Sequence, residues 1–91
     1  MPKFVIERPL PGAGVLTGDE VQGISQKSNE VIDSMAGRVQ WLESFVTTDK
    51  LYCIYIADGE ESVYEHARNG GFPCEAVNQV ARVIDPSTGE I

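Results

Sequence analysis

The hydrophobic and polar residues of this chain follow two periodicities, one typical of strands and one typical of helices. β-Branched and aromatic residues mixed with polar ones mark four strand-like runs: residues 3–8, 39–46, 51–56 and 75–84, the last strongest over 79–84. The second and third runs flank a short polar stretch, Thr47 to Lys50, which suits an antiparallel hairpin. The pattern therefore predicts four strands, of which the middle two are paired.

Two segments place their apolar residues at helical spacing. The first begins where Thr17 stands three residues before Glu20, as in a capping box, and its apolar positions recur toward Gly37, the predicted C-cap. The second begins at Asp58, which with Glu61 repeats the capping spacing, and it ends at a pair of glycines. Each helix therefore lies between two predicted strands.

The order of these elements, β-α-β-β-α-β, is that of the ferredoxin-like α+β fold. In this fold a four-stranded antiparallel sheet carries both helices on one face. No internal repeat, low-complexity tract or linker divides the chain. The sequence therefore predicts a single ferredoxin-like domain over residues 1–91.

The predicted hairpin has two largely apolar faces. With Val46 opposite Leu51, alternation groups the following residues on one face: Trp41, Glu43, Phe45, Tyr52, Ile54 and Ile56. The other face then holds Leu42, Ser44, Val46, Leu51, Cys53 and Tyr55. Because helices cover only one face of such a sheet, the other face needs a partner, which a second copy would supply. We therefore expect a homodimer.

The charge of the chain limits the kinds of partner that it can bind. The composition, 42% hydrophobic and 23% charged, is that of an ordinary globular domain. Seven basic and fourteen acidic residues give a net charge of -7, which repels the phosphate backbone of nucleic acids. The basic residues are scattered singly, so no basic amphipathic stretch favours an anionic membrane surface. We expect neither nucleic acid nor membrane as a partner.

The N-terminal residues indicate the compartment. They are charged from the third residue onward and include no apolar run long enough for a signal peptide or a membrane span. The expected location is the cytoplasm, where the two cysteines, Cys53 and Cys74, stay reduced. We therefore interpret both as free thiols.

Two segments have the most distinctive sequences, WLESFVTTDKLYCIY (residues 41–55) and EHARNGGFP (residues 65–73). They resemble the small nickel-binding protein family, long known only as a domain of unknown function. The segments FVIER (residues 4–8) and VIDP (residues 83–86) look like the first and last strands of that family. The resemblance implies a ferredoxin-like protomer, a dimer similar to the dimeric α/β barrels, and nickel binding in at least some members.

Nickel accepts imidazole, thiolate and carboxylate ligands, which makes the set of candidate metal ligands small. It comprises His66, Cys53, Glu7 and Glu43, with Cys74 less favoured because it follows Pro73 in a loop. Each has an ordinary alternative. Without a metal, the histidine would be a boundary residue that forms a hydrogen bond, and the cysteine would be a small hydrophobic residue. Each glutamate would then pair with an arginine or contact solvent.

Four further residues are candidates for the lining of a pocket: Trp41, Ser44, Tyr52 and Tyr55. Aromatic side chains at strand spacing belong to a hydrophobic core more often than to a pocket. The glycines of residues 9–14 lack the lysine and hydroxyl residue of a phosphate loop, so they predict a turn. The sequence indicates no organic cofactor.

Three functions remain open at this point. The first is a non-enzymatic metal-binding or metal-responsive homodimer, with nickel or another divalent transition metal as its ion. The alternative is a cofactor-independent small-molecule enzyme of the dimeric α/β-barrel type, similar to a monooxygenase or isomerase, which would bind its ligand between sheet and helices. A structural or interaction module is the plainest interpretation. The sequence favours the first without defining a substrate or a catalytic residue.

Overall fold

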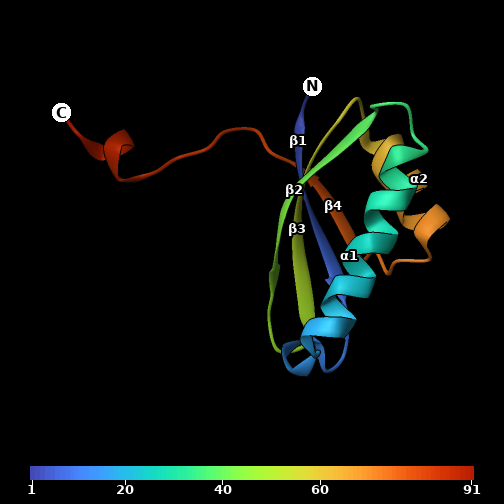
Figure 1. The fold of residues 1–91 in the computed structure, drawn as a ribbon. Helices are drawn as coiled ribbons and strands as arrows, with labels where there is room; N and C mark the ends of the chain where they lie inside the picture. Colours follow the sequence, from blue (N-terminus) through green and yellow to red (C-terminus); the bar gives the residue numbers. More distant parts are fainter.

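A single antiparallel sheet with both helices on one face forms the body of the molecule (Figure 1). The computed structural model describes all residues, 1–91. The elements along the chain are β1 (Lys3–Pro9), α1 (Gly18–Asp33), β2 (Val39–Val46), β3 (Lys50–Ala57), α2 (Glu60–Gly70) and β4 (Ala76–Gln79). The strand order, β2-β3-β1-β4, confirms the predicted ferredoxin-like fold.

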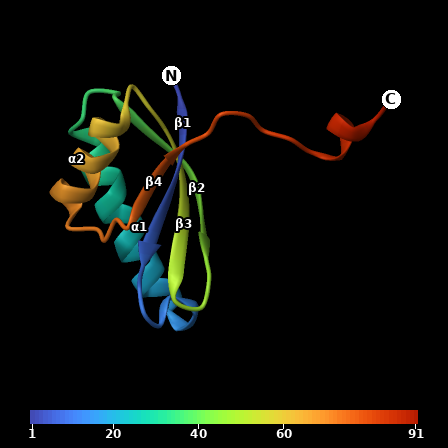
Figure 2. The same cartoon turned by 180° about the vertical axis from the view of Figure 1, so that it is seen from behind.

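The hydrophobic core lies between the sheet and the two helices. Alternation along the central strand β1 buries Phe4, Ile6 and Arg8 beneath the helices, whereas Val5 and Glu7 face the other side and are only partly covered. The buried residues of the core form one cluster: Phe4, Ile6, Val31, Met35, Val39, Cys53, Tyr55, Ala57 and Val63. Figure 2 shows the same arrangement from behind, with no helix on the second face of the sheet.

A β-bulge in β2 moves Trp41 to the other face of the hairpin, while the predicted faces hold from Glu43 to Ile56. Val46 pairs with Leu51 as predicted, but Trp41 pairs with Tyr55 and Glu43 with Ile54, so that Leu42 is an extra residue. One extra residue reverses the alternation beyond it. The prediction that Trp41 shares a face with Tyr52 is therefore wrong. Trp41 lies on the helix-covered face and is partly buried there.

The first helix begins as predicted and ends earlier than predicted. The hydroxyl of Thr17 accepts a hydrogen bond from the backbone of Glu20, and the Glu20 carboxylate accepts one from Thr17, which confirms the capping box. The helix ends at Asp33. Two residues with positive φ, Ala36 and Gly37, then form the loop that leads into β2. Gly37 is thus a turn residue rather than the C-cap.

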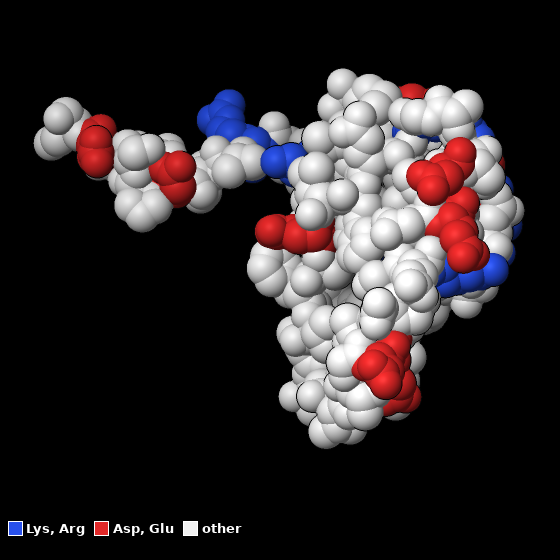
Figure 3. Space-filling model, in the orientation of Figure 1, with Lys and Arg blue, Asp and Glu red and all other residues white.

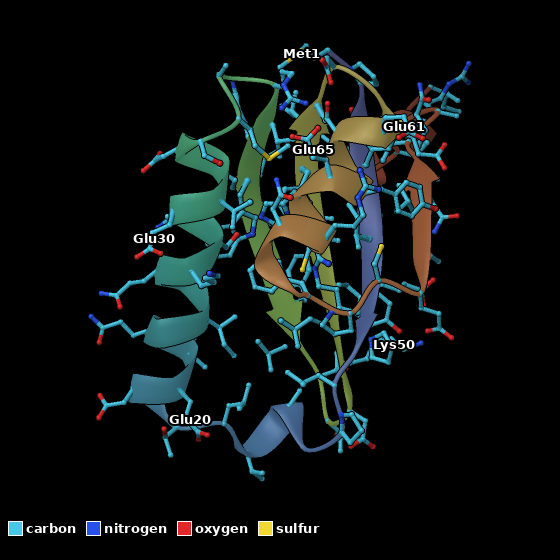
Figure 4. All side chains as sticks on the ribbon, turned by 90° about the vertical axis from the view of Figure 1, so that its right-hand side faces the viewer. Met1, Glu20, Glu30, Lys50, Glu61 and Glu65 are labelled. Atoms are coloured by element: carbon cyan, nitrogen blue, oxygen red, sulfur yellow. The ribbon has the colours of Figure 1, made fainter.

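The second helix has a different N-terminus from the predicted one. Its N-cap is Gly59, because the Asp58 carboxylate accepts a hydrogen bond from the Ser62 hydroxyl instead of capping the helix backbone. Its C-cap is Gly71, with a φ of 68°, as the glycine pair predicted. Figure 4 shows α2 beside α1 in front of the sheet, with Glu30 on the side of α1 turned away from α2.

The last strand is shorter than predicted, and its second half is not a strand. β4 pairs only with residues 4–7 of β1, and the final backbone hydrogen bond runs from Val80 to Lys3. Beyond Lys3 no further residue of β1 pairs with this segment, because β1 begins at Lys3. Residues 81–91 are exposed and lead away from the sheet, ending in a short 3-10 turn (Figures 1 and 2).

Removal of residues 81–91 tests this description of the tail. Because no residue of this segment is buried, we expect the free energy of unfolding in urea to change by less than about 0.5 kcal/mol. A chain cut before β4, ending at residue 75, serves as the control and should unfold. A large loss of stability on removing 81–91 alone would show that the tail packs against the fold or a second copy.

Candidate functional site

A pocket with a volume of about 250 Å³ lies between α1 and the sheet. Its apolar wall consists of Leu16, Val21, Ile24, Val46, Leu51 and Phe72. Val21 and Ile24 belong to the N-terminal half of α1 and are 38% and 36% exposed. Apolar residues of a helix normally pack against the core. Their exposure shows that this half of α1 stands off the sheet and leaves the pocket open.

Polar groups converge on the pocket from three strands and from α1. Ser25 and Ser28 come from α1, Ser44 and Trp41 from β2, and Arg8, Cys53 and Tyr55 from the central strands. The indole nitrogen of Trp41 donates to the Ser44 hydroxyl oxygen at 2.9 Å, which fixes both side chains next to the bulge. Apolar walls with a few polar groups are typical of small-molecule sites.

Arg8 is buried in the wall of this pocket, with 5% of its surface exposed. One terminal nitrogen donates to the Pro73 carbonyl oxygen at 2.9 Å, and the other donates to the Tyr55 hydroxyl oxygen at 3.4 Å. The guanidinium carbon lies 5.7 Å from the ring centre of Tyr55 and 5.5 Å from that of Phe72. Two aromatic faces therefore stabilise the cation.

His66 lies directly behind the pocket and is 1% exposed. Its Nε2 is 3.1 Å from the hydroxyl oxygen of Ser28, while its Nδ1 is buried without a hydrogen-bond partner. Burial lowers the pKa of His66 to about 4, and the positive charge of Arg8 adds to the effect. The imidazole is therefore neutral at physiological pH.

The two cysteines are free and differ in burial. Cys53 is buried on the helix-covered face, where it pairs with Ser44 across the strands as predicted. Cys74 is partly buried beside the core, and burial raises the pKa of its thiol. A protonated thiol is a poor metal ligand and a poor nucleophile. Cys74 therefore has no evident chemical role.

The two candidate carboxylates lie on the opposite face of the sheet from Cys53 and His66. Glu7 pairs with Lys50 at 3.2 Å, and Lys50 also contacts Glu75 at 3.1 Å. Glu43 is exposed and forms no ion pair. The sheet itself thus separates the carboxylates from the imidazole and the thiol.

This arrangement does not fit a metal ion within the chain. No three His, Cys, Asp or Glu side chains lie close enough to hold an ion together. The cation of Arg8 acts on His66 and would repel a divalent metal there. The four predicted donors therefore do not form one site in a single chain.

Three of the four candidate pocket residues line the pocket, namely Trp41, Ser44 and Tyr55. The fourth, Tyr52, lies on the open face, where the Lys50 amine is 6.0 Å from its ring centre. The sequence pattern did not identify Arg8, Ser28 and Phe72 as pocket residues. The alternation Phe4-Ile6-Arg8 could have indicated the arginine, because it occupies the third inward position of β1.

The sheet, the two helices and the pocket between them define a ferredoxin-like α+β protein with a cavity on the helix-covered face. A family model described as "Nickel responsive protein SCO4226-like" matches residues 4–80, and the chain belongs to this family. The resemblance noted in the sequence is thereby confirmed.

A solved structure, the crystal structure of SCO4226 from Streptomyces coelicolor A3(2), is similar to this chain with a TM-score of 0.76. The two are 15% identical, and the similarity covers 90% of this chain and 99% of that one. No curated protein matches the chain. Neither helix is both long and apolar enough to cross a bilayer.

Titration of the sole histidine tests the environment of the pocket. The unfolded chain binds a proton near pH 6.5 and the folded chain only near pH 4, so acidification between these values favours unfolding. We expect the wild type to be roughly 2 kcal/mol less stable at pH 5 than at pH 7.

Urea unfolding measures the stability at each pH, and the proton NMR signal of the imidazole measures the pKa of His66. A His66→Gln variant keeps a polar group near Ser28 and should not lose this stability between pH 7 and pH 5. An imidazole that titrates near pH 6.5 would contradict the burial of His66.

Proposed function

We propose that this protein is a non-enzymatic, homodimeric member of the nickel-responsive family that binds a small molecule in the pocket between α1 and the sheet. The observation that carries the proposal is the pocket itself. It combines an apolar wall with convergent hydroxyl groups and one buried cation. Its volume of about 250 Å³ lies just below the roughly 300–1,000 Å³ of typical ligand sites, so it suits a compact ligand.

The side chains around the pocket support binding rather than catalysis. A serine next to a histidine suggests a nucleophile and its base, but His66 has a pKa of about 4 and no group orients its Nδ1. Burial raises the pKa of the Tyr55 hydroxyl. The pocket therefore has no strong base or activated nucleophile to begin a reaction at neutral pH.

Two small aromatic probes, 2-phenylethanol and phenylacetate, test the pocket. Trp41 is the only tryptophan and lines the cavity, so its fluorescence reports occupancy directly. We expect a saturable change in emission with at least one probe. Ser25→Phe should fill the cavity and weaken binding roughly tenfold, because overpacking excludes the ligand.

The neighbouring variant Gln26→Phe is the matched control, since it introduces the same side chain at a residue that is exposed and outside the lining. It should bind as the wild type does. Absence of saturable binding of both probes to the wild type would refute the pocket proposal, and turnover of a probe would favour the enzyme alternative.

The open face of the sheet supports the homodimer. No helix covers this face (Figure 2). Its apolar side chains are partly or largely exposed: Val5, Phe45, Tyr52, Ile54 and Ile56. Phe45 alone is 54% exposed. A two-fold partner that places the same face against it would bury these residues, as in the dimeric α/β barrels. We assign this face to the dimer interface.

Direct nickel binding is a second candidate, and Glu43 is the observation that favours it. Glu43 lies among the apolar residues of the open face and has no cationic partner within the chain. Burial of an unpaired carboxylate is costly, so in a dimer Glu43 needs a counter-charge. We propose that nickel is held between two protomers by carboxylates of the open face, rather than in the pocket by His66 and Cys53.

Sedimentation and calorimetric nickel titration of the untagged chain test both assignments. We expect the wild type to be a dimer at tens of micromolar. Glu43→Gln should lose nickel binding, and Ile54→Glu should lose both dimerisation and nickel binding. Val15→Glu, which adds the same charge at a residue that is 84% exposed, should retain both.

His66→Gln should also retain nickel binding. A strictly monomeric wild type would refute the interface. Nickel binding that depends on His66 and not on Glu43 would place the metal in the pocket.

A further inference from the structure

The buried guanidinium of Arg8 has no anionic partner. Its hydrogen bonds go to a carbonyl and to a phenol, and no carboxylate lies within ion-pair distance. An ionised group removed from water is costly unless a counter-charge compensates it. Neutral partners and two aromatic rings compensate it only in part. The site thus has a net positive charge in an apolar environment.

Arg8 is the only buried lysine or arginine of the chain, and it lacks a carboxylate partner although two less buried cations have one. Two cations outside the pocket have carboxylate partners: Arg38 contacts Glu65 at 2.6 Å, and Lys50 contacts two glutamates. The chain has fourteen Asp and Glu residues, yet none of them lines the pocket. Figure 3 shows acidic side chains in separate groups on the outer surface. The carboxylates of the chain therefore lie outside the pocket that holds the buried cation.

We propose that the pocket binds a small organic monocarboxylate with an apolar body, whose carboxylate contacts the guanidinium of Arg8. The inference rests on the proposed function of the same pocket and specifies its ligand class. A carboxylate would supply the missing negative charge, and the ligand body would cover the exposed apolar residues of α1.

The chemistry of the wall selects this class. A guanidinium is planar and presents paired donors that match the two oxygens of a carboxylate. Trp41, Tyr55 and Phe72 provide aromatic surfaces for an apolar body. A second negative charge on the ligand would find no further cation, because Arg8 is the only charged residue of the lining. The pocket therefore favours one carboxylate over a multiply charged anion.

Comparison of three probes at pH 7 tests the charge requirement in the full-length protein. Phenylacetate is the proposed type of ligand, 2-phenylethanol is its neutral analogue of similar size, and inorganic phosphate is an anion without an apolar body. Trp41 fluorescence and calorimetry measure each affinity. Since hydrogen bonds to charged groups contribute about 1.5–3 kcal/mol, we expect phenylacetate to bind roughly 10- to 100-fold more tightly than the alcohol.

Variants at Arg8 show whether this residue causes the preference for phenylacetate over 2-phenylethanol. Arg8→Met removes the charge and should reduce the affinity for phenylacetate to that for the alcohol, whose own binding should change little. Arg8→Lys keeps the charge without the paired donors and should bind phenylacetate with intermediate affinity. Arg38→Met removes the same charge outside the pocket and should bind both probes as the wild type does.

The outcomes separate this inference from the function on which it rests. Equal affinity of the wild type for the acid and the alcohol would overturn the carboxylate assignment and leave a neutral-ligand pocket. Phosphate that binds as tightly as phenylacetate and displaces it would also overturn the assignment. Failure of both aromatic probes to bind would refute the pocket as a binding site. If Arg8→Met does not fold, the wild-type comparison and Arg8→Lys decide the question.

Discussion

The structure depends on one constraint: the sheet has two faces, and the chain has helices for only one of them. Each strand sends alternate side chains to opposite faces, so the central strand β1 directs Arg8 toward the helices and Glu7 away from them. The helix-covered face consequently holds the core and the pocket, and the open face holds apolar residues that are only partly buried. Pocket and proposed dimer interface are therefore two sides of the same strands.

The same separation governs the electrostatics. On the helix-covered face the cation of Arg8 lies near His66 and keeps the imidazole neutral, so this side favours anions. On the open face Glu7 pairs with Lys50, whereas Glu43 has no cationic partner. The imidazole and the carboxylates do not converge because strand alternation places them on opposite faces. A divalent cation and an organic anion would thus be expected on different faces.

Much of the fold could be predicted from the sequence, because hydrophobic periodicity and capping residues are local signals. The hairpin pairing of Val46 with Leu51 and the capping box at Thr17 are examples. The bulge at Leu42 could not be predicted, since it depends on how β2 fits against β3 and α1. The end of β4 was also missed, because it is set by where β1 runs out of backbone partners rather than by residues 80–84 themselves.

The pocket shows why a site is harder to predict than the elements that form it. Histidine, cysteine and glutamate are the expected candidates because they are common ligands, whereas Arg8 looks like an ordinary charged residue at the end of a strand. Its significance comes from what surrounds it in three dimensions: two aromatic rings, neutral hydrogen-bond partners and no carboxylate. An unbalanced buried charge cannot be seen from a single position in the sequence. It requires the burial of the residue and the identity of every neighbour, and these are properties of the folded chain alone.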